Sequence, residues 1–281
     1  MAPSKLRCRG SVECGQAPSG EAGSVVMSEI VTGELVHYGV DRGIARVVLD
    51  SPHNRNALSR QLCAELDAHL SSAATDPAVR AVELTHTGSV FCAGADLGEA
   101  SSGSSITETM ISLLRRIVEM PKPVVARLDG HVRAGGLGLV GAADIALASR
   151  SVTFAFTEVL IGVAPAMITL TTLGRMTERA AGRYLLTGEK FDAATAAGVG
   201  LITAAVDDLD RATADLYDQL RTCSPQGLAE TKLLTTRLTR EAIDSRAEDL
   251  AALSARLFGS DEAREGMRAF LEKRSPSWVL D

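Results

Sequence analysis

The sequence predicts an α/β fold, and three observations support this prediction. Short runs rich in β-branched residues, at residues 36–49, 79–85 and 124–128, are typical of buried strands. Helical patterns separate these runs, and a chain that alternates strands with helices builds parallel sheet with crossover helices. From Ala166 onward the pattern is almost entirely helical, so we expect a helical C-terminal third.

The elements can be assigned in order from local signals. Residues 36–40 and 44–49 are predicted to form a hairpin, because Asp41-Arg42-Gly43 between them is a turn sequence. Leucines at 62, 66 and 70 recur at helical spacing, and Pro77 ends that helix. Further strands are expected at residues 79–85, 124–128, 144–148 and 153–156, and further helices at 105–120, 178–186, 193–197, 209–221, 225–238, 243–258 and 261–273.

Composition limits the class of protein. The 281 residues are 46% hydrophobic and carry a net charge of −6, which disfavours nucleic acid as the main partner. The five cysteines form no CxxC pair and the histidines no metal spacing, so we expect no metal site. No apolar run approaches the length of a membrane span, and no signal peptide is evident. A cytoplasmic location without membrane association is therefore expected.

The chain divides into three predicted regions. Residues 1–28 are rich in Gly, Ser, Ala and Pro, which predicts a disordered extension, and the patterned sequence opens at Met27. Residues 29–220 are the predicted α/β core, and residues 221–281 the predicted helical region.

Two glycine-containing turns are candidates for chemistry. They lie at residues 91–97 and 129–139, and each follows a strand. Glycine lets the backbone approach a ligand closely, and a turn that opens a helix presents unpaired N–H groups. Two such groups that point at one oxygen form an oxyanion hole. Either turn alone is more often structural than functional.

Taken together with other segments, these turns make residues 55–278 resemble the enoyl-CoA hydratase/isomerase (crotonase) family. The matching segments are Arg55-Asn56-Ala57-Leu58, residues 91–97, Pro121-Lys122-Pro123-Val124-Val125-Ala126, residues 130–146, residues 154–165, Leu186-Thr187-Gly188, and residues 264–274. The resemblance implies a spiral of ββα turns with C-terminal helices that drive trimerisation. It also implies an acyl-CoA thioester as partner and a homotrimer or a dimer of trimers as the assembly.

The same resemblance implies the site. The thioester carbonyl would lie between the backbone N–H groups of Ala95 and Gly135, and Glu158 would be the catalytic carboxylate. We expect Val159, Leu160 and Ile161 to provide an apolar neighbourhood that raises the pKa of Glu158 toward the working pH.

Position 138 departs from the two-glutamate members of the family, because Gly138 stands where they have the other glutamate. Three readings remain open. The first and favoured one is a hydratase that uses Glu158 alone for hydration of a 2-enoyl-CoA. The second is an isomerase that moves a proton between C2 and C4. The third is a non-catalytic acyl-CoA binder.

The favoured reading follows a subgroup with glycine at the same place, which residues 134–139 and 158–166 resemble. It includes 3-methylglutaconyl-CoA and isohexenylglutaconyl-CoA hydratases, whose substrates carry a distal carboxylate. Arg133 is a candidate to bind that carboxylate, although a surface or intersubunit arginine is the more common outcome.

The resemblance also implies residues along the CoA path. They are Arg55, Ala57, Leu58, Ala93, Asp96, Leu97 and Gly136, together with Phe270 and Lys273, which would approach CoA from an adjacent subunit. CoA enters as part of the substrate, and no other cofactor is implied. Three further residues are interpreted as structural: Cys92 as a small buried residue, Asp144 as an acid at a strand start, and His131 as a packing or surface residue.

Overall fold

The computed structural model describes residues 33–99 and 105–280. The predicted extension, residues 1–28, lies outside the described residues. The chain from Glu34 onward belongs to one compact unit, which includes the described part of the predicted core and the predicted C-terminal helices. Among the residues described, no helix combines the length and the apolar character that crossing a bilayer requires.

The first sheet has six strands in the order β1-β2-β3-β5-β7-β10. They are β1 (Val36–Asp41), β2 (Ile44–Leu49), β3 (Ala81–His86), β5 (Val124–Leu128), β7 (Ile145–Ser149) and β10 (Ala204–Val206). The hairpin of β1 and β2 is confirmed: these strands are antiparallel, and Arg42 and Gly43 turn the chain with positive φ. The remaining neighbours are parallel, as the alternating pattern predicts.

The second sheet has four short strands in the order β4-β6-β8-β9. They are β4 (Val90–Cys92), β6 (His131–Arg133), β8 (Thr153–Ala155) and β9 (Phe191–Asp192). Each of β4, β6 and β8 directly follows a strand of the first sheet and is followed by helical residues, so the chain repeats a strand–strand–helix turn. Only β8 was anticipated at residues 153–156. The others are too short to show a period of two residues.

The helices confirm most of the predicted segments. They are α1 (Arg60–Thr75), α2 (Ser105–Glu119), α3 (Gly135–Ala142), α4 (Thr169–Thr172), α5 (Glu178–Thr187), α6 (Ala193–Gly198), α7 (Leu209–Thr222), α8 (Pro225–Thr235), α9 (Arg237–Phe258) and α10 (Asp261–Leu271), with 3₁₀ turns η1 (Pro52–Asn54) and η3 (Glu158–Ile161). The expectation that the chain is almost all helix after residue 166 was wrong at β9 and β10. The predicted gap at residues 239–242 was also wrong, because α9 runs through it.

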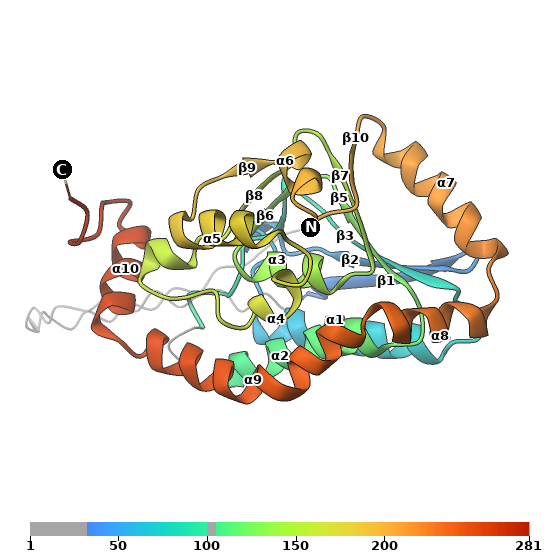
Figure 1. Ribbon diagram of the computed structural model, residues 1–281, viewed down its shortest axis with the longest axis horizontal. Coiled ribbons are helices and arrows are strands. Elements are labelled where there is room, and N and C mark those ends of the chain that lie inside the picture. Colours follow the sequence, from blue (N-terminus) through green and yellow to red (C-terminus); the bar gives the residue numbers. More distant parts are fainter. Residues whose placement is uncertain (1–32, 100–104, 281) are drawn as a thin grey trace, which may run out of the picture. The chain divides into compact units, whose positions relative to one another are not determined.

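The two faces of the first sheet bury different helices. Val47 and Leu84 point into the main core, which also contains Leu62 of α1 and Ile117 of α2. Residues of opposite parity, such as Ile44 and Ala81, instead pack against Tyr217 and Leu220 of α7. Figure 1 shows α1, α2 and α9 on one side of this sheet and α7 on the other.

Asp144 has the structural role that its position predicts. Its Oδ2 accepts a hydrogen bond of 2.8 Å from the Val124 N–H at the start of β5. The same oxygen lies 2.7 Å from the Nζ of Lys232, a buried lysine on α8 that also donates to the carbonyls of Ile117 and Lys122. This buried ion pair connects α8 to the ends of β5 and α2.

Candidate active site

Three parallel strands of the second sheet end side by side and carry the predicted catalytic residues. Cys92 of β4 is in register with Val132 of β6, and Arg133 of β6 is in register with Ala155 of β8. The Ala134 N–H extends this ladder with a 3.1 Å hydrogen bond to the Ala155 carbonyl. The residues that follow the three strands, 93–95, 134–135 and 156–158, therefore lie at one edge of the sheet. Ligands bind at the carboxyl ends of parallel strands in many α/β proteins.

The two glycine turns touch each other at this edge. A Cβ placed on Gly94 would lie 3.2 Å from the Gly135 nitrogen, and one placed on Gly135 would lie 3.6 Å from the Ala95 nitrogen. Neither the Ala95 N–H nor the Gly135 N–H donates a hydrogen bond to another residue in the described ranges. The structure thus brings two unpaired donors together, as an oxyanion hole requires.

The backbone at Ala134 sets the direction of the Gly135 N–H. Ala134 precedes α3 with a φ of 45° and a ψ of −123°, a conformation that a residue with a Cβ rarely adopts. The chain leaves β6 and enters α3 through this one residue, so the first amide of the helix is turned toward the strand ends. The positive end of the α3 dipole adds to the attraction for an anionic oxygen.

Glu158 opens η3, three residues after the end of β8. As a residue it is half-buried, yet its Oε2 is fully buried and has no hydrogen-bond partner among the described atoms. Burial raises the pKa of the Glu158 carboxyl from 4.5 to about 7, and a hydrogen bond from its own backbone opposes this rise. A carboxyl group with a pKa near neutral pH can both accept and return a proton.

The three apolar residues that follow Glu158 differ in exposure. Val159 and Ile161 are only half-buried, and Leu160 is 50% exposed. A Cβ on Gly188 would lie 2.8 Å from the Leu160 Cγ, so the leucine side chain lies over the end of α5. Leu160 therefore does not take the predicted part in an apolar neighbourhood of Glu158, whereas the parts of Val159 and Ile161 stay predictions.

Position 138 has no room for a side chain. A Cβ on Gly138 would lie 2.8 Å from the Ile168 Cγ2 and 3.0 Å from the Met110 Cε. Both neighbours are buried apolar residues. The place where two-glutamate relatives have a carboxylate is therefore packed with hydrocarbon, which the sequence motif alone did not indicate.

The predicted CoA-path residues at 55–58 and at 93–97 belong to two segments that are hydrogen-bonded to each other. The Leu58 N–H donates to the Gly94 carbonyl at 2.8 Å, and the Ala93 N–H donates to the Arg55 carbonyl at 3.1 Å. Ala57 is buried beside them, and Gly136 lies so close to Cys92 that a Cβ would be 2.8 Å from the cysteine Cβ. Leu97 is half-buried in the turn that follows.

Asp96 belongs to the same turn and is engaged within it. Its carboxylate accepts hydrogen bonds from the Asn54 side chain at 3.0 Å and from the Gly98 N–H at 2.9 Å. This arrangement gives Asp96 a part in shaping the turn.

Asn56 is a residue whose role the sequence analysis missed. It is fully buried with a φ of 54°, and its side chain accepts from the Ser51 N–H and donates to the carbonyls of Thr87 and Val90. The left-handed conformation favours asparagine over most residues. Asn56 thereby fastens the Arg55–Leu58 segment to the start of β4.

The remaining predicted binding residues are Arg133, Phe270 and Lys273. The Arg133 guanidinium donates to the carbonyls of Val132 and Thr153 and to the Thr153 Oγ1, at 2.8, 2.6 and 2.7 Å. A substrate carboxylate would have to compete with Thr153 for these donors. Phe270 on α10 is 58% exposed, and Lys273 follows the end of that helix at the surface.

Cys92 and His131 lie near this edge without a catalytic arrangement. Cys92 is fully buried, and burial raises the pKa of its thiol to about 12, so it stays protonated as expected of a packing residue. His131 contacts Thr153 through its Nδ1 at 3.2 Å. Within the described ranges, no group of three or more His, Cys, Asp or Glu side chains is placed to hold a metal ion.

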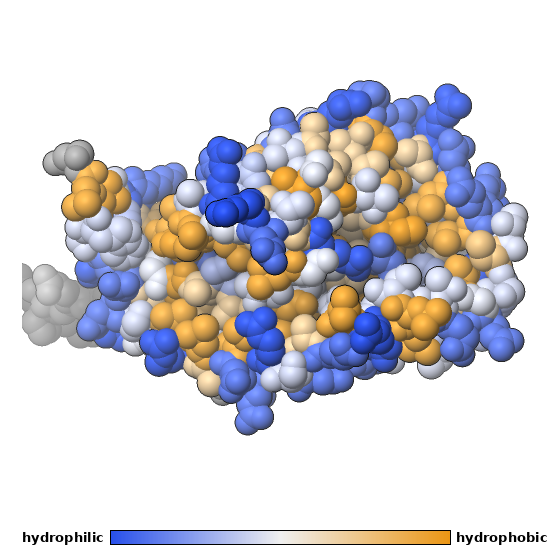
Figure 2. All heavy atoms as spheres, in the orientation of Figure 1, coloured by the Kyte–Doolittle hydropathy of each residue, from blue (hydrophilic) through white to orange (hydrophobic). Residues whose placement is uncertain are grey.

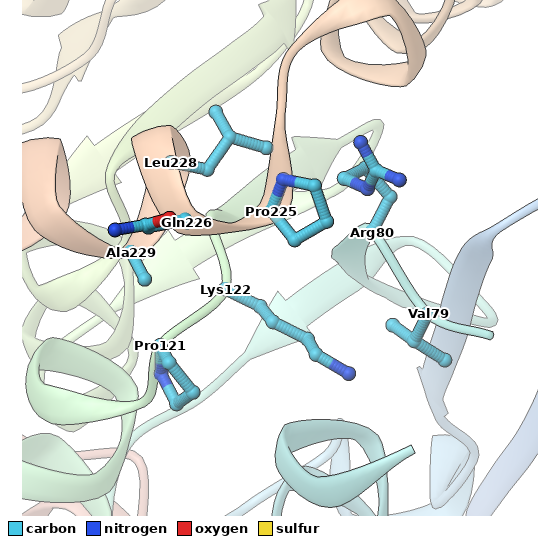
Figure 3. A pocket seen from close by; sticks show the side chains of 8 residues that line it. All are labelled: Val79, Arg80, Pro121, Lys122, Pro225, Gln226, Leu228 and Ala229. Atoms are coloured by element: carbon cyan, nitrogen blue, oxygen red, sulfur yellow. The ribbon is translucent and has the colours of Figure 1, made fainter. Parts of the chain in front are cut away.

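A cavity of about 280 Å³ lies away from this edge, where the start of β3 meets the first turn of α8. Figure 3 shows Lys122 and Arg80 beside Pro225 at its wall. The Lys122 Nζ donates to the carbonyls of Ala73 and Asp76 at the end of α1, and Arg80 donates to the Cys223 carbonyl. Its basic groups are thus engaged with the backbone.

The groups at this edge are two unpaired backbone N–H donors and one buried carboxyl group with a raised pKa, which are of the class that enzymes use to stabilise an oxyanion and to move protons. Comparison with known proteins agrees with this class. Residues 39–280 match the enoyl-CoA hydratase/isomerase family. The crystal structure of an enoyl-CoA hydratase from Mycobacterium avium is 54% identical with a TM-score of 0.84, and the match covers 88% of this chain and 100% of that one.

Two curated relatives extend the comparison. Enoyl-CoA hydratase domain-containing protein 3, mitochondrial, of Danio rerio is 31% identical, and the match covers 97% of this chain and 94% of that protein. The 1,2-epoxyphenylacetyl-CoA isomerase of Escherichia coli K12 is 30% identical, and the match covers 88% of this chain and 98% of that protein.

The chain therefore belongs to the enoyl-CoA hydratase/isomerase family and has the crotonase fold, with two mixed sheets and C-terminal helices. Membership of this family implies an acyl-CoA substrate.

Proposed function

We propose that this protein hydrates a 2-enoyl-CoA with Glu158 as its single acid–base residue. The observation that carries the proposal is the buried Glu158 Oε2, which has no partner among the described atoms. Glu158 follows β8, the strand that pairs with β6, and β6 leads to the Gly135 N–H. A buried polar atom without a partner is costly, so its retention is reasonable where a substrate or water supplies the missing hydrogen bond.

The proposed reaction has two steps. Glu158 as a carboxylate takes a proton from water while the water oxygen bonds to C3 of the enoyl group. The electron pair of the C2–C3 double bond moves to give an enolate, whose oxygen accepts hydrogen bonds from Ala95 and Gly135. Glu158 then returns its proton to C2 and regenerates the carboxylate. A residue with a pKa near the working pH suits both steps.

The apolar packing at position 138 supports a single-glutamate mechanism. Ile168 and Met110 occupy the volume beside Gly138, so no second carboxylate extends from this helix position toward the reacting carbons. We propose 3-methylglutaconyl-CoA as the branched substrate to test first, because the glycine at this position resembles hydratases of that type. In this proposal, Arg133 would exchange its bond to Thr153 for the distal carboxylate.

The test follows enone absorbance with time for crotonyl-CoA and 3-methylglutaconyl-CoA, with wild type beside Glu158→Gln. We expect absorbance to fall with wild type and kcat to drop about 10²- to 10⁴-fold in the variant. Acyl-CoA binding should persist, because glutamine keeps the size of the side chain. Equal turnover by the variant would overturn the assignment of Glu158.

An isomerase is the second candidate, favoured by the buried Glu158 Oε2 without a partner among the described atoms and by the resemblance to a relative named as an isomerase. One carboxylate can carry a proton between C2 and C4 without adding water. A 3-enoyl-CoA that gains enone absorbance, together with no loss of absorbance from 2-enoyl-CoA, would identify this activity. Binding of acyl-CoA without turnover of either substrate would indicate a binding protein.

A further inference from the structure

The 3₁₀ turn that carries Glu158 is in backbone contact with α10. A Cβ on Gly266, in the middle of α10, would lie 2.5 Å from the carbonyl carbon and oxygen of Ile161. A Cβ on Gly162, which caps η3, would lie 2.7 Å from the carbonyl of Glu262. Real side chains do not tolerate such distances, so each of the two elements reaches the other only because it has a glycine at the contact.

Each of the two elements contributes one glycine to the contact with the other. Gly162 of η3 meets the first turn of α10, and Gly266 of α10 meets the last residue of η3. Gly162 also needs its glycine for a φ of 77°, whereas Gly266 has ordinary helical backbone. The conformation of α10 therefore does not require glycine at 266, whereas the close approach to Ile161 does.

The end of α10 is fastened separately. Glu265 accepts hydrogen bonds from the Arg274 guanidinium at 2.6 and 2.9 Å and from the Ser277 N–H at 3.0 Å. These bonds fold the tail after α10 back onto the helix. At the other end, the Ser260 Oγ caps α10 by accepting from the Ala263 N–H at 3.1 Å.

We infer that α10 is a positioning element for Glu158, and that its backbone contact through Gly162 and Gly266 holds η3 in place and keeps water from the carboxyl group. The inference rests on the proposed role of Glu158. Gly266 touches Ile161, three residues beyond Glu158 in the same 3₁₀ turn, so it acts through the turn and is a positioning residue rather than a catalytic one.

Most charged groups on α10 and α5, which pack against η3, pair with other residues. On α10, Arg264 pairs with Asp261, and Glu265 pairs with Arg268 and Arg274. On α5, Arg183 pairs with Glu189 beyond the end of the helix. The other charged residues of these helices are Glu262, Glu178 and Arg179. Burial raises the pKa of Glu158, a hydrogen bond from its own backbone opposes the rise, and none of these side chains is among the causes.

The experiment replaces Gly266 with alanine and measures the pKa of Glu158 directly. The full-length protein is labelled with ¹³C-glutamate, and its carboxyl resonances are followed as a function of pH. The resonance that is absent from the spectrum of Glu158→Gln is assigned to Glu158. Alanine is a better helix former than glycine, so Gly266→Ala does not weaken α10 itself. Its Cβ pushes α10 away from η3 and admits water, so the pKa of Glu158 should fall by about one pH unit or more toward 4.5.

Gly182→Ala is the matched control. Gly182 is an exposed glycine within α5, and a Cβ there meets nothing within 4 Å. Gly182→Ala should therefore leave the pKa of Glu158 unchanged. In activity assays, the limb of the kcat profile that reports Glu158 should move to lower pH in Gly266→Ala and stay in place in Gly182→Ala, with KM little affected in both.

The outcomes separate this inference from the proposed function. A well-folded Gly266→Ala protein with an unchanged Glu158 pKa would overturn the role of α10. A lowered pKa in a protein that hydrates no enoyl-CoA even as wild type would support α10 and remove the hydratase proposal. If Gly266→Ala does not fold, Ser260→Ala loosens the first turn of α10 by removing its cap. That variant should lower the same pKa by a smaller amount, and no change would overturn the inference.

Discussion

Burial of the Glu158 carboxyl group makes the stability of the folded protein depend on pH. The unfolded chain titrates near 4.5 and the folded protein near 7, so between these values the folded protein binds the extra proton. The free energy of unfolding therefore falls as pH rises through this window, by about 3 kcal/mol in total. The buried carboxyl group of Glu158 is thus retained at a cost in stability.

Glu158→Gln should remove this pH dependence. Glutamine has no charge to bury, so the variant should gain stability over wild type as pH rises from about 4.5 to 7, up to about 3 kcal/mol above pH 7. Urea unfolding of both proteins at pH 5, 6, 7 and 8, at one protein concentration, measures the difference. A constant difference across this range would mean that the carboxyl group titrates at its ordinary pKa.

Gly138→Glu should not restore a second catalytic carboxylate. Met110 can move the end of its side chain, but Ile168 presents its Cβ and Cγ2 to the new side chain. We expect a loss of about 1–3 kcal/mol from overpacking and no gain in hydration rate. Urea unfolding and kcat measure both effects. Combining Gly138→Glu with Ile168→Ala tests the cause, because it should recover part of the stability; a faster single variant would contradict the packing argument.

At the scale of elements, helices contribute to the site by contacts that lie far apart in the sequence. α3 supplies the Gly135 N–H, α10 contacts the turn that carries Glu158, and α8 is joined to the first sheet by the Lys232–Asp144 pair. Lys232 and Asp144 are 4% and 14% exposed, so the pair is shielded from water. Breaking a shielded pair costs more than breaking a surface one, because the remaining charge stays buried.

Lys232→Met should therefore destabilise the protein by about 3–5 kcal/mol, since it leaves the Asp144 carboxylate without its cation. Urea unfolding at pH 7 gives the value. Lys190→Met, at an exposed lysine, is the matched control and should change stability by less than about 0.5 kcal/mol. Adding Asp144→Asn to Lys232→Met should recover part of the loss, and an additive further loss would contradict the ion-pair explanation.

At the scale of the whole molecule, large apolar side chains remain exposed on the C-terminal helices. Leu234 and Leu238, around the junction of α8 and α9, are 76% and 68% exposed, and Phe270, Leu271 and Leu280 add to this set beyond α9. Figure 2 shows apolar surface over α8 and beside the end of α10. Exposed apolar patches of this kind are typical of protein interfaces, which supports the proposed homotrimer or dimer of trimers.

Analytical ultracentrifugation should give a mass about three or six times 29.5 kDa. Leu234→Lys should shift the distribution toward the monomer, because a charge in an apolar interface is costly to bury. Val40→Lys, at an exposed position on the edge strand β1, serves as the control and should leave the mass unchanged. A monomer in wild type would remove the trimer proposal.

Local pattern alone was enough for much of this protein. Strand and helix periods identified the hairpin of β1 and β2 and the central strands β3, β5 and β7 within a few residues. They did the same for the helices from α5 onward, except at the start of α9. These signals depend on neighbours along the chain, so they can be read without the fold. Resemblance of the glycine turns to the crotonase family likewise singled out Ala95, Gly135 and Glu158 as candidates. These residues follow three strands that the structure brings to one edge.

Only the tertiary structure decided how those residues work together. Strands of three residues, such as β4 and β6, are too short to show a two-residue alternation. The second sheet, at whose edge the candidate site lies, was therefore not predicted as a sheet. Ile168 and Met110 fill the space at Gly138, and α10 lies against η3 more than a hundred residues away along the chain. Close packing between distant segments determines which groups meet and which are shielded from water, and no window of sequence contains that information.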